Sequence, residues 1–226
     1  MKKLFLLLLP ALILAGACNR MGSVTYFGTE AGSMAAGVFT SDDGVEMTVV
    51  SNEGKYDVTS SRRVLVSYET LPVSDPGHIE INLNGLLDAG ILPTARVDAL
   101  PENPDGTAIQ ISDAWFSKDY LNVLANFEGN DATKHAFTAT YTADEKGIVV
   151  RLSHEGSQDT ASGALSCFLC IPIYEPVLSY DQIAKSVGLK APYPADVILQ
   201  WTSTTLDGGP LTLYERKGSY TPTVAD

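Results

Sequence analysis

The chain has 226 residues, of which 45% are hydrophobic, and it carries 15 basic against 27 acidic side chains, a formal charge of −12. This acidic balance argues against nucleic-acid partners, because binding to phosphate backbones requires clustered Lys and Arg that displace counterions. The length allows one large or two small domains, and the apolar fraction is sufficient to build a core in each.

The N-terminus has the layout of a bacterial lipoprotein signal. Lys2 and Lys3 precede an apolar run over residues 4–14, and three small residues lead to Cys18. A run of this length covers about half of the ~30 Å hydrocarbon core, and Pro10 interrupts it, so a membrane-spanning helix is not expected. We predict cleavage before Cys18 and lipidation of its thiol. The alternative is an ordinary secretory signal with a cysteine there by chance.

The residues after Cys18 indicate where the anchored protein resides. Asn19 stands where an aspartate would signal retention in the inner membrane of many Gram-negative bacteria. No acidic cluster follows, and some of these bacteria use such clusters for export to the outer face. We therefore expect an outer-membrane protein on the periplasmic leaflet, with the membrane as its first partner. Removal of residues 1–17 leaves 13 basic against 27 acidic side chains and a formal charge of −14.

Short strands dominate the next part of the sequence. In Arg63–Tyr68, Val64, Val66 and Tyr68 share one face, the pattern of a half-buried strand. Further candidates cover residues 24–27, 35–40, 45–49 and 77–83. Four or five strands within about 70 residues predict a small barrel.

Between residues 91 and 108 this pattern stops. Four pairs that break regular structure fall there: Leu92-Pro93, Leu100-Pro101, Asn103-Pro104 and Asp105-Gly106. A domain boundary near residue 104 is the natural division. We therefore predict a signal peptide over residues 1–17, a first domain over 18–104 and a second over 105–226.

The second domain contains seven predicted strands, over residues 109–116, 120–127, 134–141, 148–154, 163–171, 197–203 and 211–216. Their length and the turns between them predict an antiparallel β-sandwich. One short helix interrupts them: Ser179 can cap it, Ile183 and Val187 lie on its apolar side, and Gly188 ends it. The expected fold is therefore all-β, a small barrel followed by a seven-stranded sandwich.

Two cysteines, Cys167 and Cys170, have CxxC spacing within the predicted strand 163–171. On a helix N-terminus this spacing would indicate a redox motif or half of a zinc site. In a strand the two side chains face opposite sides about 10 Å apart, too far for a disulfide. We predict two buried free thiols.

Two segments resemble a known family. Arg62–Tyr68, read RRVLVSY, and Ile111–Val123, read ISDAWFSKDYLNV, are similar to the RVLVNY and I-D-W...DYLNV segments of the NigD-like lipoproteins of gut and oral anaerobes. The resemblance implies a lipoprotein signal, an OB-like N-terminal barrel and a C-terminal β-sandwich. The family is named after its association with a bacteriocin operon. This association implies no catalytic residue for this chain. Residues 172–194, with the helix, depart from the family pattern.

Few residues suggest catalysis. His135 and His154 lie on strands that could bring them together as a metal or acid–base pair, although histidines at strand ends more often complete a structural hydrogen bond. His78 has no evident partner. The sequence lacks a nucleophile elbow, and its Asp-Gly turns do not continue with the spacing of a calcium loop. We therefore predict no catalytic residue, no cofactor and no metal.

A binding module is the remaining class of function. Trp115, Phe116 and Tyr120 bracket the first hairpin turn of the predicted sandwich, and aromatic rings supply large contact areas. They form a possible interaction surface if they are exposed, and belong to the core if they are not. We expect a non-catalytic envelope protein that binds an unknown protein or neutral glycan. The alternatives are an accessory protein for glycan or peptide binding, and a hydrolase with an unrecognised site.

Overall fold

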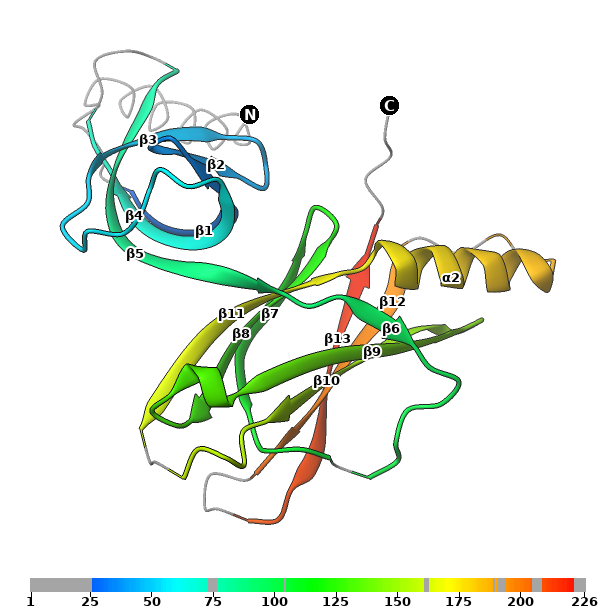
Figure 1. Ribbon diagram of the computed structural model, residues 1–226. Coiled ribbons are helices and arrows are strands. Elements are labelled where there is room, and N and C mark those ends of the chain that lie inside the picture. Colours follow the sequence, from blue (N-terminus) through cyan, green and yellow to red (C-terminus); the bar gives the residue numbers. More distant parts are fainter. Residues whose placement is uncertain are drawn as a thin grey trace, which may run out of the picture.

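The computed structural model describes residues 26–72, 77–103, 105–160, 163–188, 190, 194–204 and 209–221. Cys18 and the signal segment lie outside these residues. The described part is built from β-strands, with one α-helix at the side of the molecule, so the predicted all-β class is confirmed (Figure 1). None of its helical structure is long and apolar enough to cross a membrane.

Five strands form a small barrel: β1 (Phe27–Ala35), β2 (Val38–Ser41), β3 (Glu46–Ser51), β4 (Arg62–Thr70) and β5 (Ile79–Ile91). β1 pairs with β2 and β4, β2 pairs with β3, and β5 closes the barrel by pairing with both β4 and β3. This closed order is that of an OB-like barrel, as expected. Its core is formed by Met34, Phe39, Met47, Val64, Val66, Tyr68, Ile81 and Leu83.

The first hairpin differs from its prediction. Ala36 and Gly37 have φ values of 50° and 81° and form a tight turn inside the segment predicted as one strand over 35–40. β1 is consequently longer than expected and ends just before this turn. A non-glycine residue in the left-handed region gives little sign in the sequence, which explains the error.

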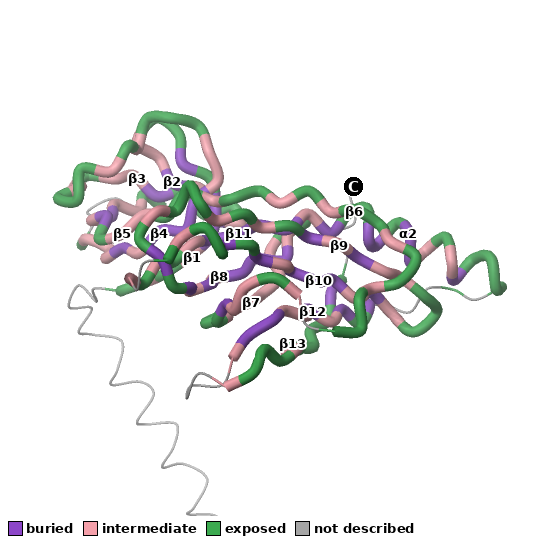
Figure 2. The backbone as a smooth tube through the Cα atoms, turned by 60° about the horizontal axis from the view of Figure 1, so that its bottom comes forward, coloured by how far each residue is buried: buried purple, intermediate pink, exposed green. Residues whose placement is uncertain are grey.

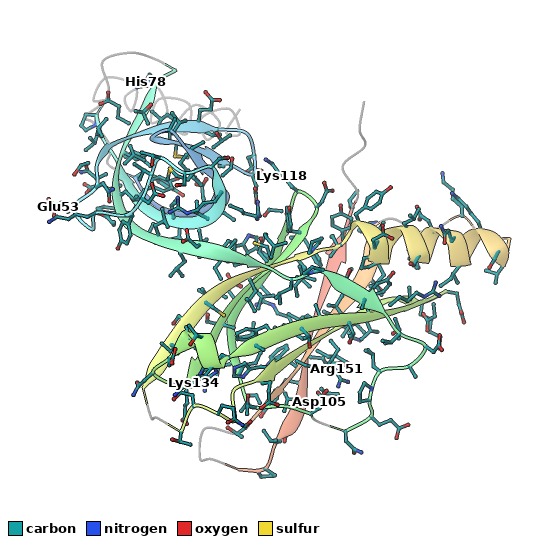
Figure 3. The ribbon with its side chains drawn as sticks, viewed as in Figure 1. Glu53, His78, Asp105, Lys118, Lys134 and Arg151 are labelled. Atoms are coloured by element: carbon teal, nitrogen blue, oxygen red, sulfur yellow. The ribbon has the colours of Figure 1, made fainter. Side chains whose placement is uncertain are left out.

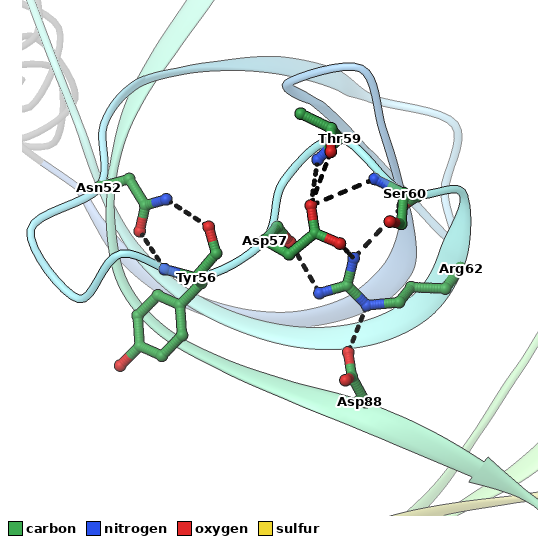
Figure 4. A network of polar contacts seen from close by, with 7 residues as sticks. All are labelled: Asn52, Tyr56, Asp57, Thr59, Ser60, Arg62 and Asp88. Atoms are coloured by element: carbon green, nitrogen blue, oxygen red, sulfur yellow. Dashed lines mark hydrogen bonds and ion pairs between the residues drawn. The ribbon is translucent and has the colours of Figure 1, made fainter.

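The loop before β4 is fastened by side-chain hydrogen bonds (Figure 4). Asn52 brackets Tyr56, accepting from its backbone N–H and donating to its carbonyl. Asp57 accepts from Thr59, while Arg62 reaches both Asp57 and Asp88. These bonds close the loop on the barrel without a helix.

The sandwich has two layers. β7 (Gln110–Ser117), β8 (Tyr120–Glu128) and β11 (Ala164–Pro172) lie in one, and β6 (Thr94–Arg96), β9 (Ala136–Asp144), β10 (Gly147–Glu155), β12 (Ala195–Ser203) and β13 (Thr212–Tyr220) form the other. Figure 2 shows buried positions following the strands of both halves of the molecule. The sandwich core includes Leu121, Val123, Ala125, Tyr141, Ile148, Val150, Leu152, Leu169, Ile171, Val197 and Leu199.

The sandwich was predicted to be antiparallel, but two of its strand pairs are parallel. β10 and β12 run parallel, as do β6 and β9. The reason lies in the connection: the chain leaves β10, crosses to β11 in the other layer, and returns through helix α2 (Tyr174–Ser186), so that β12 enters in the direction of β10. Parallel neighbours need such a crossover connection.

Helix α2 begins before the predicted cap. Ser179 lies inside the helix, where its hydroxyl shares a hydrogen bond of 2.8 Å with Tyr141 of β9. Pro176 in the first turn is compatible with a helix start, because the missing N–H would be unpaired there anyway. The predicted end at Gly188 is confirmed by its φ of 74° and its N–H bond to Lys185.

The two halves are joined through the sheet. The last residues of β5 pair with β11 from Ala89 to Ile91, so one eight-stranded sheet runs from the barrel into the sandwich. β6 pairs with β9 in the five-stranded sheet. Residues 89–96 thus pair with strands of the second half, whereas the division at residue 104 remains a prediction. After β6, Pro101 lies over the outer face of the second layer, where its carbonyl accepts a hydrogen bond from Arg151 of β10.

Candidate functional site

The three aromatic residues of the predicted interaction surface pack against neighbouring side chains. Trp115 stacks on Phe168 at a centroid distance of 6.0 Å, and Phe116 packs against Tyr220 at 5.7 Å. Tyr120 lies beneath the guanidinium group of Arg63, 4.3 Å from its ring centre. All three rings are half-buried. Their packing gives each a structural role, and the interaction surface stays a prediction.

A buried polar cluster lies where the barrel meets the sandwich. Arg63 of β4 donates to both oxygens of Asp42, at 2.8 and 2.7 Å, and to Asn122 Oδ1 at 2.9 Å. Its Nε donates to the thiol of Cys170 at 3.1 Å. Ser117 donates to Asp42 and accepts from Asn122. The five residues, called the Arg63 cluster below, join four separate strands and one turn.

In the Arg63 cluster the positive charge of Arg63 is balanced by the negative charge of Asp42. The side chains of Asp42 and Arg63 are only 7% and 13% exposed. Burial alone would raise the pKa of Asp42, but the hydrogen bonds from Arg63 and Ser117 and the nearby positive charges lower it. Burial raises the pKa of Cys170, which keeps the thiol protonated. Arg63 and Asn122 each lie in one of the two segments that resemble the NigD-like family.

The structure brings His135 and His154 together. Nδ1 of His135 lies 2.9 Å from Nε2 of His154, and the rings are stacked. Asp159 lies 3.3 Å from the other side of His135, and the Thr107 hydroxyl lies 2.8 Å from Nδ1 of His154. The sequence alone did not decide whether the two histidines are close to each other. Asp159 itself carried no recognisable signal.

This histidine pair is enclosed at one end of the sandwich core. The side chains of His135 and Asp159 are 2% and 3% exposed. Phe127 packs within 4.6 and 5.0 Å of the two imidazole centres. Burial, together with neighbouring His135, lowers the pKa of His154. Such enclosure favours the structural alternative over a metal or acid–base pair, and no group suited to a metal ion occurs among the described residues.

The remaining candidates can now be placed. Cys167 and Cys170 are free and lie on opposite faces of β11, as predicted, although Cys167 is only half-buried. Burial raises the pKa of Cys167 to about 12. His78 lies on the barrel beside Glu80 (Figure 3).

A buried arginine lies on the outer face of the second layer, beside Pro101. Arg151 of β10 donates to the Pro101 carbonyl at 2.9 Å and to Gln200 at 3.1 Å. Its Nη1 lies 3.6 Å from Asp105 (Figure 3). These contacts hold Pro101 and Asp105 over one half of the outer face of the sheet.

The other half of that outer face carries a groove, which sequence reasoning missed. Its volume is about 360 Å³, within the range of small-molecule sites. Val149 of β10 and Ile198 of β12 contribute apolar surface, since the two residues lie on the outer face of neighbouring strands. The groove, called the β13 groove below, is lined by Asp144, Lys146, Gly147, Ile148, Val149, Asp196, Val197, Ile198, Lys217 and Gly218.

Strand register shapes the β13 groove, and two of its lining glycines stand too close to neighbouring atoms to carry a side chain. Lys217 of β13 pairs with Ile198, which places its side chain beside the apolar surface. At Gly147 a Cβ atom would lie 2.6 Å from the carbonyl oxygen of Asp196, and at Gly218 it would lie 2.8 Å from the Phe116 ring. Side chains at these positions would force the neighbours apart. The four charged residues, Asp144, Lys146, Asp196 and Lys217, lie around the groove because strands that are far apart in the sequence are neighbours in the sheet. The alternation of apolar residues within one strand cannot reveal this.

Comparison with known proteins identifies a shared fold. No protein-family model and no curated protein matches the sequence. A NigD-like immunity protein from Bacteroides caccae is 18% identical, with a TM-score of 0.57, and the match covers 90% of this chain and 100% of that one. A protein of unknown function from Bacteroides vulgatus is also 18% identical, with a TM-score of 0.54 and coverage of 89% and 93%.

A third structure, of a protein from Bacteroides fragilis described as a candidate lipoprotein, is 12% identical. Its TM-score is 0.56, and the match covers 85% of this chain and 97% of the other. The likeness to a NigD-like structure therefore extends over the barrel and the sandwich together. At these identities the comparisons show the fold and leave ligand and activity to be argued from the site.

Proposed function

We propose that this protein is a non-catalytic, lipid-anchored binding protein of the outer membrane whose ligand occupies the β13 groove. The groove itself carries the proposal, since it combines an apolar surface with two lysines and two aspartates in one recess. The lipid anchor is supported by the layout ahead of Cys18 and by the structural relative described as a candidate lipoprotein.

The chemistry of the described residues supports binding over turnover. His135, His154 and the thiol of Cys170 are engaged by neighbouring side chains in buried clusters. The charged groups of the β13 groove are exposed instead, and they are two of each sign. A ligand with hydrogen-bonding groups and some apolar surface fits this lining, and peptides and neutral glycans have both. The formal charge of −14 disfavours anionic polymers.

Binding can be tested with the full-length protein in detergent. Calorimetry with a panel of neutral oligosaccharides and peptides should identify a ligand whose affinity falls at least tenfold in Lys146→Ala or Asp196→Ala. Lys185→Ala is the matched control, because Lys185 is exposed on α2 and does not line the groove. A ligand whose affinity is unchanged by Lys146→Ala and by Asp196→Ala would place the binding site elsewhere.

A second assay separates binding from catalysis. The same panel should be recovered unchanged after prolonged incubation with the protein. Hydrolysis that disappears in His135→Ala or His154→Ala would overturn the proposal in favour of an enzyme, provided that the variant retains its β-rich circular dichroism spectrum.

A further inference from the structure

The sheet edges of the described chain are not equally protected. β6, at one edge of the five-stranded sheet, has three residues, and β7, at the edge of the other layer, has a register shift between Ile111 and Asp113. The barrel is closed by the pairing of β3 with β5. Short strands, bulges and closure all prevent pairing with another chain.

β13 has none of these protections. It is an edge strand of nine residues that pairs with β12 over its whole length, from Thr212 to Tyr220, without a register shift. Residues 215–219 are exposed, as the green trace of this strand shows (Figure 2). Its outer backbone groups have no strand partner among the described residues. An edge of this kind is a template for another strand.

The sequence of β13 is complementary to itself. In an antiparallel pair of two copies centred on Arg216, Thr212 lies opposite Tyr220, so the two strands overlap completely. Glu215 of each copy then lies opposite Lys217 of the other. Both side chains are on the outer face of the sheet, since Glu215 pairs with Gln200 and Lys217 with Ile198 in the neighbouring strand.

The charges of this arrangement favour it. Opposite charges directly across a strand pair attract at Cβ distances of about 4.5–5.5 Å. The two Arg216 side chains meet at the centre, but each is paired with its own Asp113 at 3.0 Å. The net charge, −12 for the full sequence and −14 without residues 1–17, opposes association, although salt screens it beyond about 8 Å at physiological ionic strength.

We propose that two copies of this chain associate through antiparallel pairing of their β13 strands, forming one continuous ten-stranded sheet. Lys217 lines the β13 groove, so the Glu215 of the second copy would lie at the rim of that groove. The dimer therefore completes one side of the recess. This proposal stands on the strand edge and its charges, and it does not depend on what the groove binds.

Charge reversal provides the test. In a twofold dimer each substitution acts twice, so Glu215→Lys or Lys217→Glu should each weaken dimerisation of the full-length protein in detergent at least tenfold. The double variant Glu215→Lys/Lys217→Glu restores both opposite-charge pairs and should recover dimerisation. Sedimentation velocity measures each equilibrium, and sharing of detergent micelles affects all variants alike.

Two further measurements complete the test. A mixture of the two single variants should form a heterodimer, because each supplies the charge that the other lacks. Amides of β13 should gain protection from hydrogen exchange as the wild-type concentration rises. A wild-type protein that stays monomeric, or a double variant that remains as weak as the single ones, would overturn the proposal, and so would capture of a foreign peptide by β13 in place of the second copy.

Discussion

Replacement of Arg63 should destabilise the protein more than replacement of its sequence neighbour. In Arg63→Met the carboxylate of Asp42, whose side chain is 7% exposed in the structure, loses both guanidinium bonds, while Asn122 and Cys170 each lose a donor. Breaking a buried ion pair from one side costs about 3–5 kcal/mol, a large part of the ~5–15 kcal/mol by which most domains are stable.

Arg62→Met is the matched control. Arg62 also forms two ion pairs, with Asp57 at 3.4 Å and with Asp88, but both acids are at least half exposed. Exposed pairs contribute about 0–1 kcal/mol. Urea unfolding of the two variants should therefore show a difference of at least about 2 kcal/mol in the free energy of unfolding.

A second substitution identifies the cause. Asp42→Asn in the Arg63→Met background removes the stranded charge and should recover part of the lost stability, because an unpaired buried carboxylate is the main cost. Equal stability of Arg63→Met and Arg62→Met would refute the reasoning. It would mean that water reaches Asp42 and that the Arg63 cluster does not hold the barrel to the sandwich.

The remaining predictions concern the histidine pair, the thiols and the anchor. Because burial holds the pKa of His154 below its usual value of 6.5, the unfolded chain takes up this proton first, and stability should fall as the pH drops below 6.5. Urea unfolding at pH 8 and pH 5.5 measures this loss, and His154→Gln should reduce it; an equal loss in the variant would assign it to other groups. Cys167 and Cys170 should remain unpaired and react slowly with iodoacetamide, and an intramolecular bridge in non-reduced peptide mass spectra would contradict the strand geometry. Cys18→Ala should abolish incorporation of a fatty-acid analogue, whereas absence of label on the wild-type protein would exclude the lipid anchor.

Alternation of apolar residues was sufficient to locate most strands. Val64, Val66 and Tyr68 form one buried face of β4, as the sequence predicts, because a strand exposes every second residue to the same side. Strand direction was less accessible. The parallel pairing of β10 with β12 follows from a crossover through α2, and no local pattern encodes it.

For the candidate site, too, the sequence indicated some features, whereas others depend on the tertiary structure. The sequence indicated that His135 and His154 could meet, since both lie at ends of neighbouring strands, and they do. It could not indicate Asp159, which reaches them from a loop. The β13 groove combines residues from a turn and four strands, so only the register reveals it. Sequence left Trp115 open between an interaction surface and the core, and the structure shows that its ring stacks on Phe168.

The claim that the β13 groove is the binding site is tested most directly inside the cell envelope. A photoreactive amino acid at position 146, which lines the groove, should cross-link to a ligand or partner in living cells, and the same residue at position 185 on α2 should not. Mass spectrometry of the purified protein reads out the adduct. Adducts at position 146 that disappear in Asp196→Ala are the predicted result. Adducts of equal yield at both positions, or at position 185 alone, would contradict the claim.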